Sequence, residues 1–259
     1  MAVDLAYQEL GDPGAPALVI LHGLFGSGRN WRSVGQRLAR GRRVVLADAR
    51  NHGASPRAPG MDYRAQAADV ERLMDRLGIG RAALLGHSMG GKTAMTLALT
   101  RPERVERLVV ADIAPVRYGH SFEDLLAAME SLDLGHLGSR READAGLAAH
   151  IGDAALRAFL LTNLDGRPGQ WRWRVDLPAI HAALPQLLDF PAVMPGRPYP
   201  GPALFVAGGA SHYVRPEHEA RIRALFPQAR IARIEGAGHW LHAERPEAFL
   251  ALVEPFLAA

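Results

Sequence analysis

The chain has 259 residues, of which 48% are apolar and 22% charged, so it is long enough and apolar enough for one large α/β domain with an insertion. Its 30 basic and 27 acidic residues give a net charge of only +3, and the scattered arginines disfavour a nucleic-acid-binding surface. The chain has no cysteine, which excludes disulfides, thiolate metal sites and cysteine nucleophiles.

Short apolar runs alternate with helical patterns along much of the chain, which predicts a mostly parallel, doubly wound sheet. In chain order the expected elements are a strand at 17–21, a helix at 30–39, strands at 43–47 and 82–85 on either side of a helix at 62–77, a helix at 91–99, strands at 107–111, 203–207 and 229–234, and a helix at 244–257. Asp62 is typical of a helix N-cap, and Gly78 of a C-terminal stop.

The alternation stops at residues 113–201, which contain no convincing strand. Helix-start signals follow one another there instead, at Ser121, Ser139, Asp153 and Pro178. A helical insertion between two strands is typical of a cap over the carboxyl ends of the strands. We therefore expect a core of residues 1–113 and 202–259 and a helical cap of residues 114–201. A helical layer packed elsewhere on the core is the alternative.

A Gly-x-Ser-x-Gly sequence at residues 86–90 joins the strand at 82–85 to the helix at 91–99. A serine on such a tight turn is held at positive φ, which lifts its hydroxyl out of the sheet edge. Side chains at Gly86 and Gly90 would collide with the neighbouring strand and helix. We predict that Ser88 is a catalytic nucleophile; the alternative is an ordinary tight turn with a capping serine.

A serine hydroxyl needs a base that takes its proton and a third group that orients the base. His239 follows the last strand on a glycine-rich loop, where α/β-hydrolases place that base. His87 and His22 are in positions more often filled by local hydrogen-bonding groups. His242 has a metal-like spacing from His239, but no HExxH sequence or third ligand accompanies it, so no metal site is expected.

The orienting acid is predicted at Asp112. Many α/β-hydrolases carry it after the strand that precedes the histidine strand, but residues 207–214 contain no carboxylate. Asp48 and Asp112 each end another strand, and only the strand before Asp112 would lie between the serine and histidine strands. The alternative role of Asp112 is to cap the first turn of the linker into the cap.

The oxyanion hole is expected to combine the backbone N–H of Met89 with one from the loop at 22–25. In that loop Leu24 is the first choice and Phe25 the second. Phe25 and Trp240, with Met89 and cap residues, are expected to line an apolar acyl pocket. The polar turn at 48–55 is interpreted as support for the loop.

Several of these segments resemble the YbfF-type esterases, which are small capped α/β-hydrolases related to a mitochondrial abhydrolase group. The more specific ones are Arg50-Asn51-His52-Gly53 and Asp112-Ile113-Ala114-Pro115, and the others are residues 22–27, 86–92 and 236–240 with Thr162-Asn163-Leu164 and Trp171-Arg172-Trp173-Arg174 in the insertion. That family is similar in placing its acid on the earlier strand. The resemblance implies hydrolysis of carboxylic esters or acyl-CoA thioesters through an acyl-serine intermediate, without a cofactor, and leaves the acyl group open.

Other functions stay open at this point. Cofactor-free haloperoxidases and carbon–carbon bond hydrolases use the same triad, and a slow hydrolase-fold receptor could bind a small ligand beneath the cap. Dehalogenases and epoxide hydrolases need an aspartate nucleophile, which Ser88 disfavours. We expect a small acyl ester or thioester as partner, no nucleic acid and no membrane. The absence of a signal-like start and of an 18-residue apolar run predicts a cytoplasmic location, and the oligomeric state is open.

Overall fold

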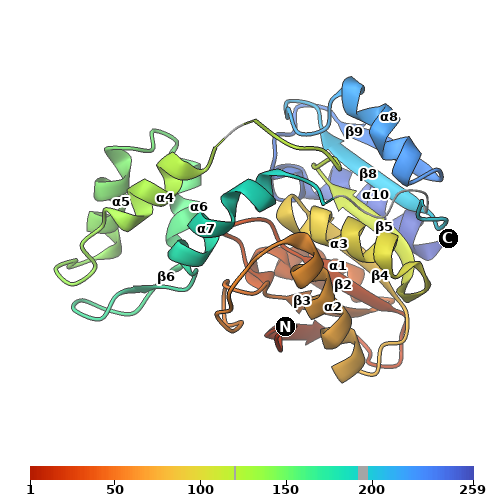
Figure 1. The fold of residues 1–259 in the computed structure, drawn as a ribbon, viewed down its shortest axis with the longest axis horizontal. Coiled ribbons are helices and arrows are strands. Elements are labelled where there is room, and N and C mark those ends of the chain that lie inside the picture. The colour runs from red at the N-terminus through yellow and green to blue at the C-terminus, as the bar shows by residue number, and fades with distance from the viewer. Residues whose placement is uncertain (120, 192–197) are drawn as a thin grey trace.

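The computed structural model describes residues 1–119, 121–191 and 198–259. Within these ranges one large sheet has seven strands in the order β1-β3-β2-β4-β5-β8-β9 (Figure 1). All neighbouring pairs are parallel except β1 and β3. The strands are β1 Tyr7–Leu10, β2 Ala17–Leu21, β3 Arg43–Ala47, β4 Ala82–His87, β5 Val105–Ala111, β8 Ala203–Gly208 and β9 Ala229–Ile234. The predicted mostly parallel, doubly wound sheet is confirmed.

The helices that flank this sheet also follow the predicted pattern, with two differences. They are α1 Arg32–Leu38, α2 Tyr63–Arg76, α3 Met89–Thr100, α8 Pro216–Leu225, α9 Leu241–Glu244 and α10 Pro246–Ala258. The helix expected at 244–257 is present as α10 but begins two residues later, because Arg245 leaves the helical conformation before Pro246 and separates α10 from the short helix α9. The sequence reading also missed α8 and the edge strand β1, whose four residues are exposed or half-buried.

Alternating side chains of the strands supply two separate layers of the core. In β2, Leu18 and Ile20 belong to the apolar cluster that includes residues of α1 and α10 on one face, whereas Val19 and Leu21 belong to the cluster that includes residues of α2, α3 and α8 on the other. A strand in the middle of such a sheet is buried on both sides, which explains its unbroken apolar run. The central strands thereby form a rigid platform whose carboxyl ends meet at one edge.

A helical layer lies to one side of this platform (Figure 1) and contains α4 Glu123–Glu130, α5 Arg140–Ala148, α6 Ala154–Leu161 and α7 Leu177–Leu188. Its apolar side chains form a third cluster, which also includes Phe25 and Met89 of the sheet platform. The expectation of no strand in this segment is wrong. Leu164–Asp165 (β6) and Arg172–Trp173 (β7) pair as an antiparallel hairpin, too short to leave a strand pattern in the sequence. Residues 120 and 192–197 of the predicted insertion lie outside the described residues.

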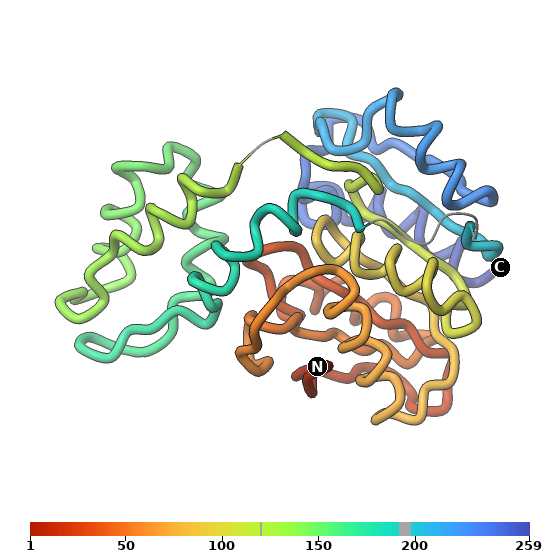
Figure 2. Tube along the Cα trace, in the orientation of Figure 1, coloured from red at the N-terminus to blue at the C-terminus, as the bar shows by residue number. Residues whose placement is uncertain are grey.

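Hydrogen bonds from Tyr63, Tyr118 and Lys92 hold the end of α7. The Tyr63 hydroxyl donates to the carbonyl of Leu187 over 2.6 Å, and the backbone N–H of Tyr118 donates to Leu188 over 2.9 Å. Lys92 Nζ donates to the carbonyl of Asp189 over 2.6 Å. Figure 2 shows α7 returning from the helical layer toward α3, which carries Lys92. No helix among the described residues combines the length and the apolar character needed to cross a membrane.

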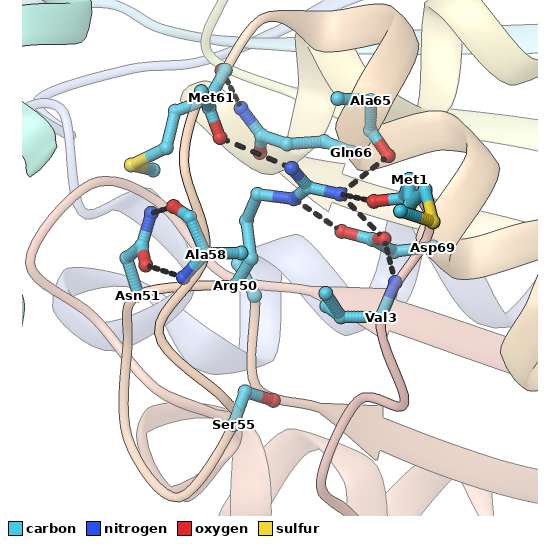
Figure 3. A network of polar contacts seen from close by, with 12 residues as sticks. Met1, Val3, Arg50, Asn51, Ser55, Ala58, Met61, Ala65, Gln66 and Asp69 are labelled. Carbon is cyan, nitrogen blue, oxygen red and sulfur yellow. Dashed lines mark hydrogen bonds and ion pairs between the residues drawn. The ribbon is translucent and has the colours of Figure 1, made fainter.

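A buried ion pair holds the polar turn after β3 in place (Figure 3). Both nitrogens of the Arg50 fork, Nε and Nη2, donate to the Asp69 carboxylate of α2, over 2.6 and 2.7 Å. Each side chain is 1% exposed. Arg50 also donates to the carbonyls of Gly60 and Met1, and Asp69 accepts the backbone N–H of Val3. The pair therefore joins the turn, α2 and the first residues of the chain.

Removing one partner of this pair should be strongly destabilising, because the other would remain charged and buried. We expect Arg50→Met to lower the free energy of unfolding by about 3–5 kcal/mol. Arg72→Met is the control, since Arg72 pairs with Asp4 at a site where both side chains are half exposed. Urea denaturation measures both variants, and equal midpoints would show that the buried pair contributes no more than the exposed one.

Candidate active site

Ser88 occupies the turn between β4 and α3 with φ of 51° and ψ of −116°. Its neighbours explain why glycines flank it. A Cβ atom added at Gly86 would lie 2.2 Å from the carbonyl oxygen of Gly90, and one added at Gly90 would lie 2.3 Å from that of Leu21. Both distances are far shorter than van der Waals contact. The turn is therefore possible only with glycine at both positions, and it projects Ser88 beyond the strand ends.

Asp112 and His239 meet across the carboxyl ends of the strands. His239 Nδ1 lies 2.8 Å from Asp112 Oδ2, and the Asp112 side chain has no exposed surface. The same carboxylate accepts hydrogen bonds from the backbone N–H of Gly208 and from the Ser211 hydroxyl. Asp112 has a φ of 48°, in the left-handed region that disfavours residues with a Cβ. Three donors thus hold the carboxylate in one orientation and fix the Nδ1 side of the imidazole.

The His239 ring is also held by its neighbours. The Tyr213 ring stacks on it with a centroid distance of 4.0 Å, and His87 Nε2 donates to the carbonyl of His239 over 2.9 Å. Burial holds the pKa of His87 well below its ordinary value, so His87 is neutral and acts as a local hydrogen-bonding group.

A cavity of about 290 Å³ opens in front of these groups. Ser88 and His239 both line it, although no hydrogen bond joins them among the described residues. Such bonds are often long before a substrate binds. Phe25 and Trp240, the two residues predicted to bind substrate, also line the cavity. Its other apolar walls come mainly from the helical layer: Phe122, Leu125, Leu156 and Phe159.

The loop predicted to supply an oxyanion donor is a tight turn of residues 23–26. The backbone N–H of Gly26 donates to the carbonyl of Gly23 over 2.9 Å, and Phe25, the third residue of the turn, has a φ of 60°. The N–H of Phe25, the second choice, already donates to His52 Nε2 over 3.2 Å. By contrast, the N–H groups of Leu24 and Met89 find no acceptor within the part of the chain that the structure describes.

Two buried histidines brace this loop. His22 Nε2 accepts the backbone N–H of Ala49 over 2.9 Å, and its Nδ1 lies 2.8 Å from the carbonyl of Gly23. Burial lowers the pKa of His52 to about 3, so its Nε2 stays unprotonated and can accept the N–H of Phe25. Asp48 belongs to the same support, since its carboxylate accepts the N–H groups of Gly28 and Ala54.

Four other side chains that the sequence singled out have different surroundings. Met89 does not line the large cavity but a smaller one of about 20 Å³ on another side of Ser88. The indole N–H groups of Trp171 and Trp173 donate to carbonyls inside the helical layer, and neither residue lines the large cavity. His242 is buried and stacks on Trp31 at 3.9 Å. The described residues contain no group of three metal-ligating side chains.

The sequence reading missed Ser211 and Tyr213, both in the loop after β8. It treated that loop only as the place where a carboxylate was absent. A hydroxyl at Ser211 carries no pattern of its own, and its contact with Asp112 depends on the closeness of the β5 and β8 ends. The one available signal was that a polar residue stands where many related enzymes place an acid.

Comparison with known proteins agrees with this architecture. Residues 16–246 match the family described as alpha/beta hydrolase fold. The sn-1-specific diacylglycerol lipase ABHD11 of Mus musculus is 45% identical over 98% of this chain and 85% of its own length. Esterase YbfF of Escherichia coli is 36% identical over 93% of this chain and 92% of its own length.

A solved structure titled "Marine microorganism esterase" superposes with a TM-score of 0.94 at 35% identity, covering 99% of this chain and all of the other. The predicted resemblance to the YbfF-type esterases is thereby confirmed. The chain belongs to the α/β-hydrolase fold family and is a carboxylic ester hydrolase.

Proposed function

We propose that the protein is a serine esterase in which Ser88, His239 and Asp112 form the catalytic triad. The observation that carries the proposal is the hydrogen bond between His239 Nδ1 and the buried Asp112 carboxylate, beside a cavity that both His239 and Ser88 line. The bond leaves His239 Nε2 as the nitrogen that takes the proton of the Ser88 hydroxyl. The strained backbone at Ser88 supports the same role, since a serine there is presented at a strand end.

The proposed reaction has two steps. Ser88 Oγ attacks the substrate carbonyl while His239 takes its proton, and the leaving alcohol or thiol departs with that proton. A water molecule, deprotonated by His239, then attacks the acyl-serine, and Ser88 recovers a proton as the acid is released. The negative charge of each tetrahedral intermediate is bound by the free N–H groups of Leu24 and Met89. Asp112 stabilises the imidazolium in both steps.

The substrate class follows from the walls of the cavity. We infer that residues 114–201, which include α4 to α7, form a cap, and that residues 1–113 and 202–259 form the core. The apolar side chains that this cap and Trp240 contribute would surround an acyl chain of an ester or acyl-CoA thioester. The name of the mouse relative makes a diacylglycerol a further candidate. The esterase and lipase relatives support a small-molecule ester as substrate, whereas a cytoplasmic location stays a prediction of the sequence.

The nucleophile is tested with Ser88→Ala. The variant should lower turnover of p-nitrophenyl esters by about 10⁴-fold or more and abolish labelling by a fluorophosphonate probe. Its thermal midpoint should stay near that of the wild type, because only a hydroxyl is removed. Labelling that persists in the variant would place the nucleophile elsewhere. Assays with peracid and diketone substrates in the same series test for haloperoxidase and carbon–carbon hydrolase activity. A wild-type protein that the fluorophosphonate probe does not label would indicate a non-catalytic receptor.

The acid is tested with Asp112→Asn against Asp48→Asn. An amide at residue 112 favours the wrong imidazole tautomer and cannot stabilise the imidazolium, so kcat should fall by very roughly 10²–10⁴-fold. The Asp48 carboxylate accepts the backbone N–H groups of Gly28 and Ala54 instead of a histidine nitrogen, so its variant should change kcat far less, whatever it does to stability. The two variants exchanging these outcomes would contradict the assignment of Asp112.

The acyl pocket is tested at Phe159, which lines the cavity from α6 and lies 5.6 Å from the Trp240 ring, centroid to centroid. Phe159→Ala enlarges the cavity and should shift the preference among p-nitrophenyl esters toward longer chains. Phe159→Trp should shift it toward shorter ones. Both variants should keep the fluorophosphonate reactivity of Ser88. An unchanged chain-length profile in both would show that this wall does not contact the acyl chain.

A further inference from the structure

One residue of the cap contacts the backbone of the oxyanion loop directly. Asn163 Nδ2 donates to the carbonyl of Phe25 over 2.7 Å, and only 3% of Asn163 is exposed. Phe25 is separated from Asn163 by 138 positions in the sequence, so the contact exists only when the cap is seated on the core. The proposed mechanism assigns no role to this buried amide.

We propose that Asn163 is a positioning residue of the oxyanion hole, so that the hole is complete only while the cap is seated on the turn of residues 23–26. The inference rests on the proposed function, because it needs the Leu24 N–H to bind the oxyanion. Through this single amide, the position of the cap over the substrate would determine whether the oxyanion hole has its active geometry.

The conformation of Phe25 is the reason why such a contact is needed. A residue with a Cβ at a φ of 60° is strained, and the conformation persists only where its surroundings hold it. His52 holds the peptide before Phe25 by accepting its N–H, and Asn163 holds the peptide after it by donating to its carbonyl. The core and the cap therefore each restrain one side of the same residue. Leu24, whose N–H is free, immediately precedes it.

Asn163 is itself fixed within the cap, so that its amide can transmit the cap position. Its Nδ2 also lies 3.2 Å from the carbonyl of Leu160, and its backbone N–H donates to the same carbonyl over 3.0 Å. Its own carbonyl accepts the N–H of Arg174 over 2.8 Å. The side chain is thus a rigid extension of the α6 end toward the core.

Other contacts also attach the cap to the core, so a positioning role of Asn163 can be distinguished from a role in attaching the cap. The hydroxyl of Tyr63 and the ammonium of Lys92 hold the end of α7, and the N–H of Asp176 donates to the carbonyl of Asn51. None of these bonds involves residues 23–26. Loss of the Asn163 amide should therefore leave the cap attached while the Phe25 carbonyl loses its donor.

The test compares Asn163→Leu with Thr162→Val. Leucine has nearly the size of asparagine but no donor, whereas Thr162 loses only a hydrogen bond to the Phe159 carbonyl inside the cap. We expect Asn163→Leu to lower kcat for a p-nitrophenyl ester by about 10-fold to 100-fold, less than the 10²–10³ lost when an oxyanion donor is removed outright. KM should change by less than about 2-fold, because ground-state binding does not use the hole.

An alkyl trifluoromethyl ketone supplies the second readout, because its adduct with Ser88 places a negative oxygen in the hole. Its affinity should fall by the same factor as kcat in Asn163→Leu and stay unchanged in Thr162→Val. If both variants have the same kcat and the same ketone affinity, or if Asn163→Leu changes only KM, the inference is wrong. A wild type without Ser88-dependent turnover would overturn the proposed function and this inference together.

Asn163→Asp provides a test that survives a poorly folding leucine variant. A protonated carboxyl group can donate to the Phe25 carbonyl, whereas a carboxylate can only repel it. The ratio of the variant's kcat to that of the wild type should therefore rise as the pH falls, since the donor is restored while the size stays the same. A ratio that is constant across the pH range, or that falls with pH, contradicts the positioning role.

Discussion

The close approach of three backbone segments around Ser88 is the constraint on which the rest of the site depends. The end of β2, the end of β4 and the start of α3 lie so near one another that neither Gly86 nor Gly90 has room for a Cβ atom. The N–H of Gly90 donates to the carbonyl of His22, which ties the Ser88 turn to the loop that follows β2. The Ser88 turn and the loop of residues 22–26 are thus parts of one rigid backbone unit, and the groups that hold His239 lie around it.

Strain is concentrated in this unit and around it. Phe25, Asn51, Ser88 and Asp112 are the residues other than glycine with positive φ among the described residues. Each is restrained by side chains or backbone groups that come from distant segments, as in the contacts of Asp112 with Gly208 and Ser211. Such conformations cost free energy and are kept only where neighbours hold them. The buried Arg50–Asp69 pair helps to hold these conformations indirectly, because it stabilises the turn that contains His52.

The sequence was most informative where local chemistry and strand order coincide. The apolar strands and the Gly-x-Ser-x-Gly turn have short-range signatures, and the order β4-β5-β8-β9 accounts for the meeting of Asp112 and His239. Contacts between distant segments have no such signature. Three contacts depend on how the helical layer and the loops fold back: those of His52 with the Phe25 N–H, of Asn163 with the Phe25 carbonyl, and of the Trp171 indole with the Leu137 carbonyl. β1 and the β6–β7 hairpin were too short to show a pattern.

The shared carboxylate contact of Ser211 and His239 has a consequence for the evolution of such enzymes. The end of β5 carries Asp112 and the loop after β8 carries Ser211, and the Asp112 Oδ2 that lies 2.8 Å from His239 Nδ1 also accepts the Ser211 hydroxyl. A carboxylate at residue 211 with a hydroxyl at residue 112 would therefore need two substitutions and no change at Ser88, at His239 or in the strand order.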